Sequence, residues 1–73
     1  MSINDAQRII DLLTAKLNSG EEPNITQNDI NRISFVYADD NGQPGVPTIV
    51  TDIRSKISEQ TIKEIELLGG AVV

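Results

Sequence analysis

The chain has 73 residues, a formal charge of −5, and neither cysteine nor histidine. This length allows one domain, and the missing residue types exclude a disulfide framework, a zinc–thiolate site and histidine-based catalysis. The acidic balance argues against nucleic-acid binding, which requires a basic face. The acidic side chains are dispersed, with Glu21-Glu22 and Asp39-Asp40 as the longest runs, and we expect them on a solvated surface.

Residues 2–18 are predicted to form an amphipathic helix. Apolar side chains recur there at the i, i+3, i+4, i+7 spacing that places them on one helical face: Ala6, Ile9, Ile10, Leu13 and Leu17. Asn18-Ser19-Gly20 follows, and glycine readily adopts the left-handed conformation that ends a helix. We therefore expect the helix to stop there and to bury its apolar stripe.

A second, short helix is predicted at about residues 27–32. Thr26 is a good N-cap, and Asp29 lies three residues on, as a capping box requires. Ile25 and Ile30 fall at the two positions that form a hydrophobic staple at the start of a helix. These local patterns favour a helix of barely two turns.

Two strands are predicted to follow as a β-hairpin. Residues 33–37 are β-branched and aromatic, with Phe35 and Tyr37 on one face, and residues 46–53 form the return strand. Pro47 limits how much of the return strand can pair inside a sheet. A lone hairpin is marginal, so it must pack on the helices, and it has two free edges unless a partner adds strands.

The turn between the strands includes an acidic cluster at residues 39–41. This cluster could bring oxygen ligands together, but it fails the spacing of a calcium-binding loop. If Gly42 were the sixth position of such a loop, the first and twelfth would be Tyr37 and Thr48, and neither supplies a carboxylate. We therefore expect a solvated turn, no metal ion and no stabilisation by calcium.

A final helix is predicted before Gly69-Gly70. Two starting points fit the sequence. Ser58 as N-cap gives a helix over residues 59–68, and Thr51 as N-cap gives a longer helix with an apolar face. We favour the shorter helix, because the β-branched run that includes Thr51 has the propensity of a strand.

Gly69 and Gly70 have two interpretations. The first is a helix C-cap followed by a frayed end. The second rests on residues 57–70, which resemble the helical end of a double-glycine leader peptide, with Leu67 where such leaders carry an apolar residue. The match is partial, because Glu64 occupies another such position. The resemblance implies a maturation enzyme that cuts the chain after the two glycines.

Apolar residues cluster at the end of the sequence, where fraying would expose them to water. We expect them to be buried, either on the core of the chain itself or on a partner. With two aromatic residues and no disulfide, the core of so short a chain is small, so association is the expected further source of burial. The candidate interaction residues are Phe35, Tyr37, Leu67, Leu68, Val72 and Val73.

The expected architecture is one α+β domain over residues 1–73, in the order helix, short helix, β-hairpin, helix. The expected function is a non-enzymatic protein–protein interaction module, such as a small subunit, adaptor or inhibitor, that binds a protein partner or self-associates. Its size and composition are typical of phage-encoded structural and host-blocking proteins. The alternative is a precursor or leader peptide that a maturation enzyme recognises.

No catalytic motif or phosphate-binding loop occurs in the sequence, so we expect no catalytic residue and no cofactor. We also expect no nucleic acid, membrane or small-molecule substrate as a partner. The expected location is the cytoplasm, of an infected host cell in the phage case, or the virion, because the sequence lacks a recognisable secretion signal.

Overall fold

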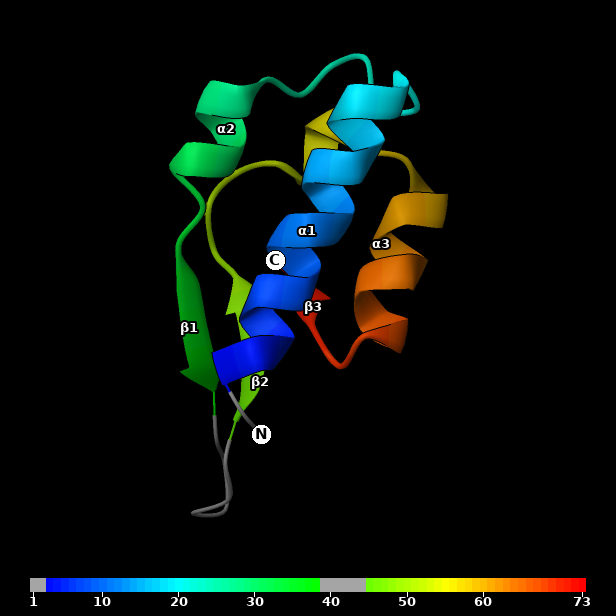
Figure 1. The fold of residues 1–73 in the computed structure, drawn as a ribbon. Coiled ribbons are helices and arrows are strands. Elements are labelled where there is room, and N and C mark those ends of the chain that lie inside the picture. Colours follow the sequence, from blue (N-terminus) through cyan, green and yellow to red (C-terminus); the bar gives the residue numbers. More distant parts are fainter. Residues whose placement is uncertain (1–2, 39–44) are drawn as a thin grey trace.

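The described residues, 3–38 and 45–73, form helices packed on one face of a small sheet in the computed structural model of the chain (Figure 1). The sheet has three strands in the order β1-β2-β3 and is mixed. This arrangement confirms the predicted α+β class. The elements are α1 (Ile3–Ser19), α2 (Gln27–Asn31), β1 (Phe35–Ala38), β2 (Val46–Ile49), the 3-10 helix η1 (Arg54–Lys56), α3 (Glu59–Leu67) and β3 (Ala71–Val72).

Helix α1 ends in a Schellman motif at the predicted glycine. Gly20 has a φ of +80°, and its N–H donates to the Leu17 carbonyl over 3.2 Å. The next N–H, of Glu21, donates to the Lys16 carbonyl over 3.1 Å. These two bonds satisfy carbonyls that the last helical turn leaves free. The apolar stripe of the helix faces the core, as predicted.

Helix α2 begins with the predicted capping box. The Asp29 N–H donates to Thr26 Oγ1 over 3.1 Å, and the Thr26 N–H donates in return to Asp29 Oδ2 over 2.9 Å. Both staple residues, Ile25 and Ile30, are buried. The helix ends at Asn31, within one residue of the predicted end.

The main difference from the predicted order is a third strand at the end of the chain. Strand β3 pairs in parallel with β2, with Thr48 opposite Ala71 and Ile49 opposite Val72. The Val73 N–H donates to the Ile49 carbonyl over 3.0 Å and extends this pairing. The predicted hairpin of β1 and β2 is confirmed, but the end of the chain is docked on its own sheet, so the prediction that both edges of the hairpin are free was wrong.

Strands β1 and β2 are shorter than predicted. Where they would continue, a hydrogen bond to the Thr51 side chain takes the place of a backbone hydrogen bond between the strands. The Ser34 N–H donates to Thr51 Oγ1 over 2.7 Å, and this hydroxyl donates to the Arg32 carbonyl over 3.2 Å. Thr51 therefore lies in a bend, and the chain turns into η1 rather than continuing as a strand to residue 53.

Pro47 lies in the central strand, opposite Tyr37. The Val50 N–H donates to the Ser34 carbonyl over 3.0 Å, and hydrogen-bonded pairs alternate along an antiparallel ladder, so the pair Tyr37–Pro47 is a non-hydrogen-bonded one. The backbone nitrogen of Pro47, which carries no hydrogen, therefore faces the β3 side of the strand rather than β1. Pairing on that side begins only at Thr48, as expected from the limit that proline sets.

Helix α3 begins where the shorter of the two predicted helices begins. Ser58 is the N-cap, and its hydroxyl oxygen accepts from the Thr61 N–H. The longer helix from Thr51 is wrong, because Ile57 is extended, with φ −121° and ψ 157°, and interrupts the helical conformation. The helix ends at Leu67, one residue before the predicted end.

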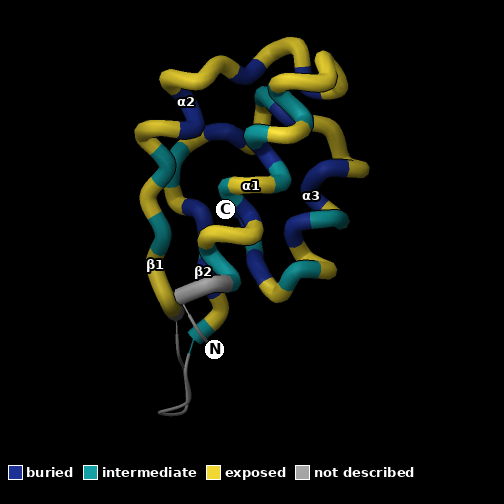
Figure 2. The backbone as a smooth tube through the Cα atoms, in the orientation of Figure 1, coloured by how far each residue is buried: buried dark blue, intermediate teal, exposed yellow. Residues whose placement is uncertain are grey.

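The core lies between the helices and the sheet, where Figure 2 shows the buried segments facing one another. Among the described residues, the cluster of buried aliphatic side chains is mostly isoleucine and contains no aromatic ring: Ile9, Leu13, Ile25, Ile30, Ile49, Ile53, Ile57, Ile62, Ile65 and Val72. The chain exposes 4551 Å², close to the roughly 4450 Å² expected of a compact monomer of 8.0 kDa. The chain is therefore about as compact as an ordinary monomer of its mass.

Candidate interaction surface

The register of the sheet places one set of side chains on the face away from the helices. Val36 lies opposite Thr48, which lies opposite Ala71, so these side chains share a face. The other face carries Ile49 and Val72, which are buried in the core. Alternation along each strand extends the first set by three valines. We define the valine face as its four exposed valines: Val36 (50% exposed), Val46 (43%), Val50 (45%) and Val73 (70%).

The valine face is open and apolar. Helix α1 passes in front of the sheet in Figure 1, so this face points away from the viewer. The solvent-facing side of an open sheet usually carries polar residues, whereas this one carries β-branched apolar side chains. With about 4.8 Å between strands and about 3.4 Å per residue, the face measures about 14 by about 17 Å. An apolar patch of this area is within the range that monomers expose, so the feature that distinguishes it is its position on a sheet face that no described helix covers.

The two edges of the sheet differ. At β3, the Arg54 guanidinium donates from Nη1 to the Val72 carbonyl over 3.0 Å and occupies part of the outer edge. At β1, Phe35 and Tyr37 direct their backbone N–H and C=O groups away from β2, because the hydrogen-bonded pairs fall at Ser34 and every second residue after it. Figure 1 shows β1 at the margin of the molecule with no element beyond it. The β1 edge is therefore open to another strand.

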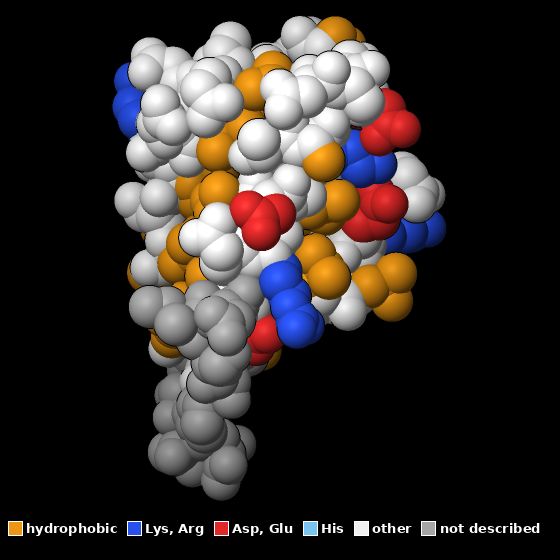
Figure 3. Space-filling model, in the orientation of Figure 1, with side chains coloured by type: hydrophobic (Ala, Val, Ile, Leu, Met, Phe, Trp, Pro, Cys, Tyr) orange, Lys and Arg blue, Asp and Glu red, His pale blue; other side chains and the backbone are white. Residues whose placement is uncertain are grey.

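A second apolar surface lies between α1 and α3. A hollow of ≈ 240 Å³ is lined by Leu12, Glu64, Leu67 and Leu68, and Leu67 is 86% exposed. Figure 3 shows apolar side chains along α1 and α3, interrupted by acidic and basic groups. The carboxylate of Glu64 pairs with Lys16 over 2.6 Å. The hollow is therefore bounded by a charged pair, unlike the valine face.

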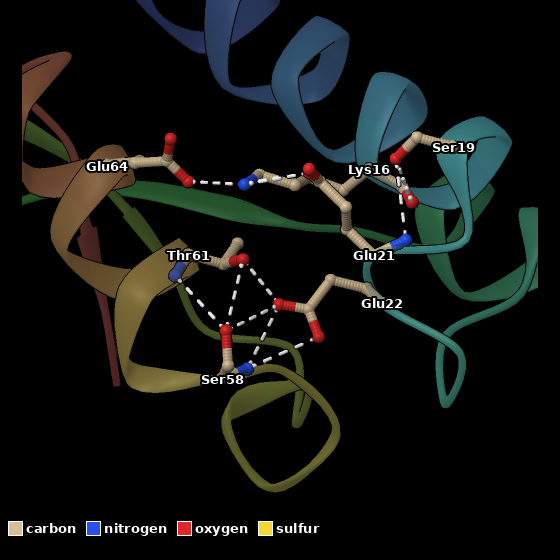
Figure 4. Close-up of polar contacts among 7 residues, drawn as sticks. All are labelled: Lys16, Ser19, Glu21, Glu22, Ser58, Thr61 and Glu64. Carbon is tan, nitrogen blue, oxygen red and sulfur yellow. Dashed lines mark hydrogen bonds and ion pairs between the residues drawn. The ribbon is translucent and has the colours of Figure 1, made fainter.

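Lys16 connects α1 to α3 and to the loop between α1 and α2. Its ammonium group pairs with Glu64 over 2.6 Å and with Glu21 over 3.1 Å (Figure 4). Hydrogen bonds to Glu64 and then to Glu21 raise the pKa of Lys16 above its ordinary value. The ammonium group therefore stays charged at neutral pH and holds the two helices together on one side.

Glu22 forms the second connection, at the N-terminus of α3 (Figure 4). Its side chain is buried, at 4% exposure, and its Oε2 accepts from the Ser58 N–H over 3.0 Å and the Ser58 hydroxyl over 2.9 Å. The Thr61 hydroxyl also donates to this oxygen. Burial raises the pKa of Glu22, but the bonds from Thr61 and Ser58 outweigh it and hold the pKa below its usual value. The carboxylate therefore acts as a helix cap from outside the helix.

Glu22 contradicts the expectation that the acidic pair at residues 21–22 is solvated. Glu21 is exposed, but the Glu22 side chain turns inward. It contacts Ser58 and Thr61, which are separated from it by 36 and 39 positions in the sequence. No local pattern marks this contact in the sequence, because the loop after α1 and the start of α3 meet only in the folded chain.

Gly69 and Gly70 each have a structural reason to be glycine. Gly69 has a φ of +86°, and its N–H donates to the Glu66 carbonyl over 3.0 Å. The Gly70 N–H donates to the Ile65 carbonyl over 3.0 Å, which completes a Schellman motif. A Cβ at Gly70 would overlap Ile9 Cδ1 and lie 3.1 Å from Ile65 Cγ2. The helix C-cap is confirmed, and the segment after it is a strand rather than a frayed end.

The candidate interaction residues do not form one surface. Val72 is buried, and Phe35 and Leu68 are partly buried against the core. Leu67 lines the hollow between α1 and α3, and Val73 belongs to the valine face. Of the four apolar residues near the end of the chain, only Val72 is buried within the chain itself.

Sequence reasoning missed three residues of the valine face: Val36, Val46 and Val50. Val46 and Val50 fall on the same side of the predicted return strand and could have suggested a second apolar face, but Thr48 lies between them on that side and Pro47 and Ile49 are apolar on the other. The aromatic residues Phe35 and Tyr37, which were the predicted interaction residues, lie on the opposite side of β1. Which face the helices cover is a tertiary property that this pattern does not reveal.

Replacing Val72 by alanine is expected to lower the free energy of unfolding by about 1.5 kcal/mol, because two buried carbon atoms are lost. The same change at Val73, which is exposed, is expected to alter stability by less than about 0.5 kcal/mol. Urea denaturation of both variants measures the difference. Equal effects at the two positions would contradict the docking of β3.

Comparisons with protein-family models, with curated proteins and with solved structures find no match. Among residues 3–38 and 45–73, no group of three metal-ligating side chains lies together, and no helix has the length and apolar character to cross a membrane. The acidic cluster at 39–41 lies outside the described residues, so the absence of a calcium effect stays a prediction.

Proposed function

We propose that this chain is a protein–protein interaction module that acts in the cytoplasm by surface contact. The observation that carries the proposal is the valine face, where four valines between 43% and 70% exposed lie on one open side of the sheet. Burying a valine side chain completely contributes about 1.5–3 kcal/mol of free energy. Covering the part of these four side chains that is still exposed would therefore favour association substantially. A protein partner that covers this face is the simplest source of that burial.

The arrangement of charge supports the same proposal. The chain has a formal charge of −5, but the positions that form the valine face and its neighbours, Thr48 and Ala71, are neutral. Binding there requires no charged group to be desolvated. The connections through Lys16 and Glu22 fix α3, and with it the start of β3, so the face is held by a rigid scaffold.

The proposal is tested by a variant that charges the face without reaching the core. Replacing both Val46 and Val50 by lysine is expected to weaken binding to a protein partner, isolated with the wild-type chain from the cells that make it, by about a hundredfold or more. The melting temperature should change little, because both side chains are about half exposed. Replacing the exposed Gln60 of α3 by lysine is a control for added charge, and should leave binding unchanged.

Two outcomes would contradict the proposal. One is a doubly substituted face variant that binds the partner as tightly as the wild-type chain. The other is a wild-type chain that retains no partner under conditions in which the purified protein is folded.

The leader-peptide alternative has less support. The C-cap conformation of Gly69 and the close packing of Gly70 explain both glycines without a processing enzyme. Cleavage after Gly70 would also require β3 to leave the sheet, because Gly70 is buried and Ala71 is paired with Thr48.

A further inference from the structure

We infer that two copies of this chain pair through β1, antiparallel and about a twofold axis at Val36, so that their sheets join into one sheet of six strands. The inference rests on the proposed function, because it concerns how two copies of the valine face combine into a larger binding surface. A single valine face covers roughly 240 Å² on strand spacings. A specific interface covers about 800 Å² on each partner. Joining two faces side by side gives roughly 480 Å², which is closer to that area.

The edge that remains open determines where the copies meet. At β3, Val72 has its carbonyl directed outward, and Arg54 donates to it over 3.0 Å. At β1, both Phe35 and Tyr37 direct N–H and C=O groups outward, and no described residue bonds to them. The strand has only four residues, but it carries no proline or charged side chain, two of the devices that protect an edge from pairing. β1 is therefore the edge at which a strand can be added.

The positions of the outward groups fix the register. In an antiparallel ladder, two residues that both face the partner exchange two hydrogen bonds. Placing Phe35 opposite Tyr37 of the second copy, and Tyr37 opposite Phe35 of the second copy, uses every outward group of these two residues. The two pairs are related by a twofold axis that passes between the two Val36 residues. The interface is therefore isologous and closes with two copies.

The side chains suit this register. At the axis, the two Val36 side chains meet in a non-hydrogen-bonded pair, where Cα atoms are about 4.5 Å apart. Each is half exposed in the single chain, so the contact buries apolar surface. On the other face, each Phe35 lies beside a Tyr37, an aromatic cross-strand pair that favours strand pairing. Because the axis is perpendicular to the sheet, the two valine faces lie on the same side.

This self-complementarity favours a second copy over a strand from another protein. A twofold at Val36 satisfies both strands with identical partners, and β1 carries no charge that would oppose the approach of two acidic chains. A contact of three paired residues per chain is short, so we expect a reversible dimer that is half dissociated on the order of 100 μM.

A charge swap at Val36 tests the axis directly. Val36→Lys alone and Val36→Glu alone each bring two like charges together at the axis, so each is expected to raise the dimer dissociation constant about tenfold or more. An equimolar mixture of the two variants should restore dimers that contain one copy of each, detected by native mass spectrometry and sedimentation. Circular dichroism and melting temperature verify that both variants fold. Val46→Lys, on the same face but on β2, is the matched control and should leave dimerisation unchanged.

Three results would overturn the inference. The first is a wild-type chain whose mass in solution stays that of a monomer up to about 1 mM. This result would overturn the inference even if the monomer accepts a strand from another protein at β1. The second is equal loss of dimers in Val36→Lys and Val46→Lys, which would place the contact on the face rather than the edge. The third is a mixture that dimerises no better than its components. None of these results by itself removes the proposed function, whose test is the binding of a partner to the Val46 and Val50 variant.

Discussion

Replacing Glu22 by alanine is expected to lower the free energy of unfolding by about 3 kcal/mol, a large share of the stability of so small a domain. The change removes the acceptor for the Ser58 N–H, the Ser58 hydroxyl and the Thr61 hydroxyl. The Thr61 hydroxyl is buried and is left without its acceptor, whereas Ser58 is exposed, so its two donors exchange a charge-assisted bond for bonds to water. Denaturant unfolding at pH 7 measures this loss.

The neighbouring glutamate is the matched control. Glu21 is exposed and bonds through its side chain to Lys16, which keeps its second partner, Glu64. Replacing Glu21 by alanine is therefore expected to cost far less stability than replacing Glu22. Equal losses for the two variants would show that the buried carboxylate is not the group that holds α3.

The stabilisation from Glu22 is also expected to depend on pH. The folded-state pKa of Glu22 is lowered relative to the unfolded chain, so its contribution is fully present above the unfolded value of about 4.3. It is lost as the pH falls through the lower folded-state pKa, because protonation of the folded chain removes an acceptor. The difference in stability between the wild-type chain and Glu22→Gln should therefore narrow below about pH 4. A difference that does not change with pH would contradict this assignment.

Replacing Gly70 by alanine is expected to lower the free energy of unfolding by about 2 kcal/mol through overpacking. The added Cβ would overlap Ile9 Cδ1 and would lie 3.1 Å from Ile65 Cγ2 and 3.3 Å from the Pro47 carbonyl oxygen. Ile9 and Ile65 are fully buried, so neither has free space into which to move. Thermal or urea denaturation measures the loss.

A double-mutant cycle identifies the atom responsible. Ile9→Val removes Cδ1, the atom that the new Cβ would overlap, and costs about 1 kcal/mol alone. The double variant should therefore be more stable than the sum of the two single losses predicts. Strict additivity would contradict overpacking against Ile9. Gly69→Ala is the control for backbone conformation: nothing lies within 4 Å of its Cβ, so its cost comes from the positive φ alone.

The helices of this fold could be predicted because their signals are local. The capping box of Thr26 and Asp29, the N-cap at Ser58 and the two glycine C-caps all act within about one turn of the residues that encode them. Each of these predictions is confirmed, with boundaries within one residue where α2 and α3 end.

The rest of the fold depends on contacts between distant segments. Strand β3 has two residues, too few for an alternating pattern, and it exists because β2 offers an edge to it. The Glu22 connection spans 36 residues to Ser58 and resembles a solvated acidic pair in the sequence. The strands shorten because Thr51 bonds across to Ser34, which propensity does not encode.

The candidate surface was predicted only in part. The sequence indicated apolar residues that would be buried by association, and Val73 is one that the fold leaves exposed. It did not indicate Val36, because the aromatic residues on either side suggested that the opposite face of β1 was the one to consider. Deciding between the two faces requires knowing where α1 packs.

Amide hydrogen exchange of β1 at two protein concentrations tests association through this edge most directly. The Phe35 and Tyr37 N–H groups point outward in the single chain, whereas the Val36 N–H faces β2 within it. We predict that exchange at Phe35 and Tyr37 slows severalfold between about 10 μM and about 1 mM, while exchange at Val36 stays the same. Exchange at Phe35 and Tyr37 that is equally fast at both concentrations would contradict the account.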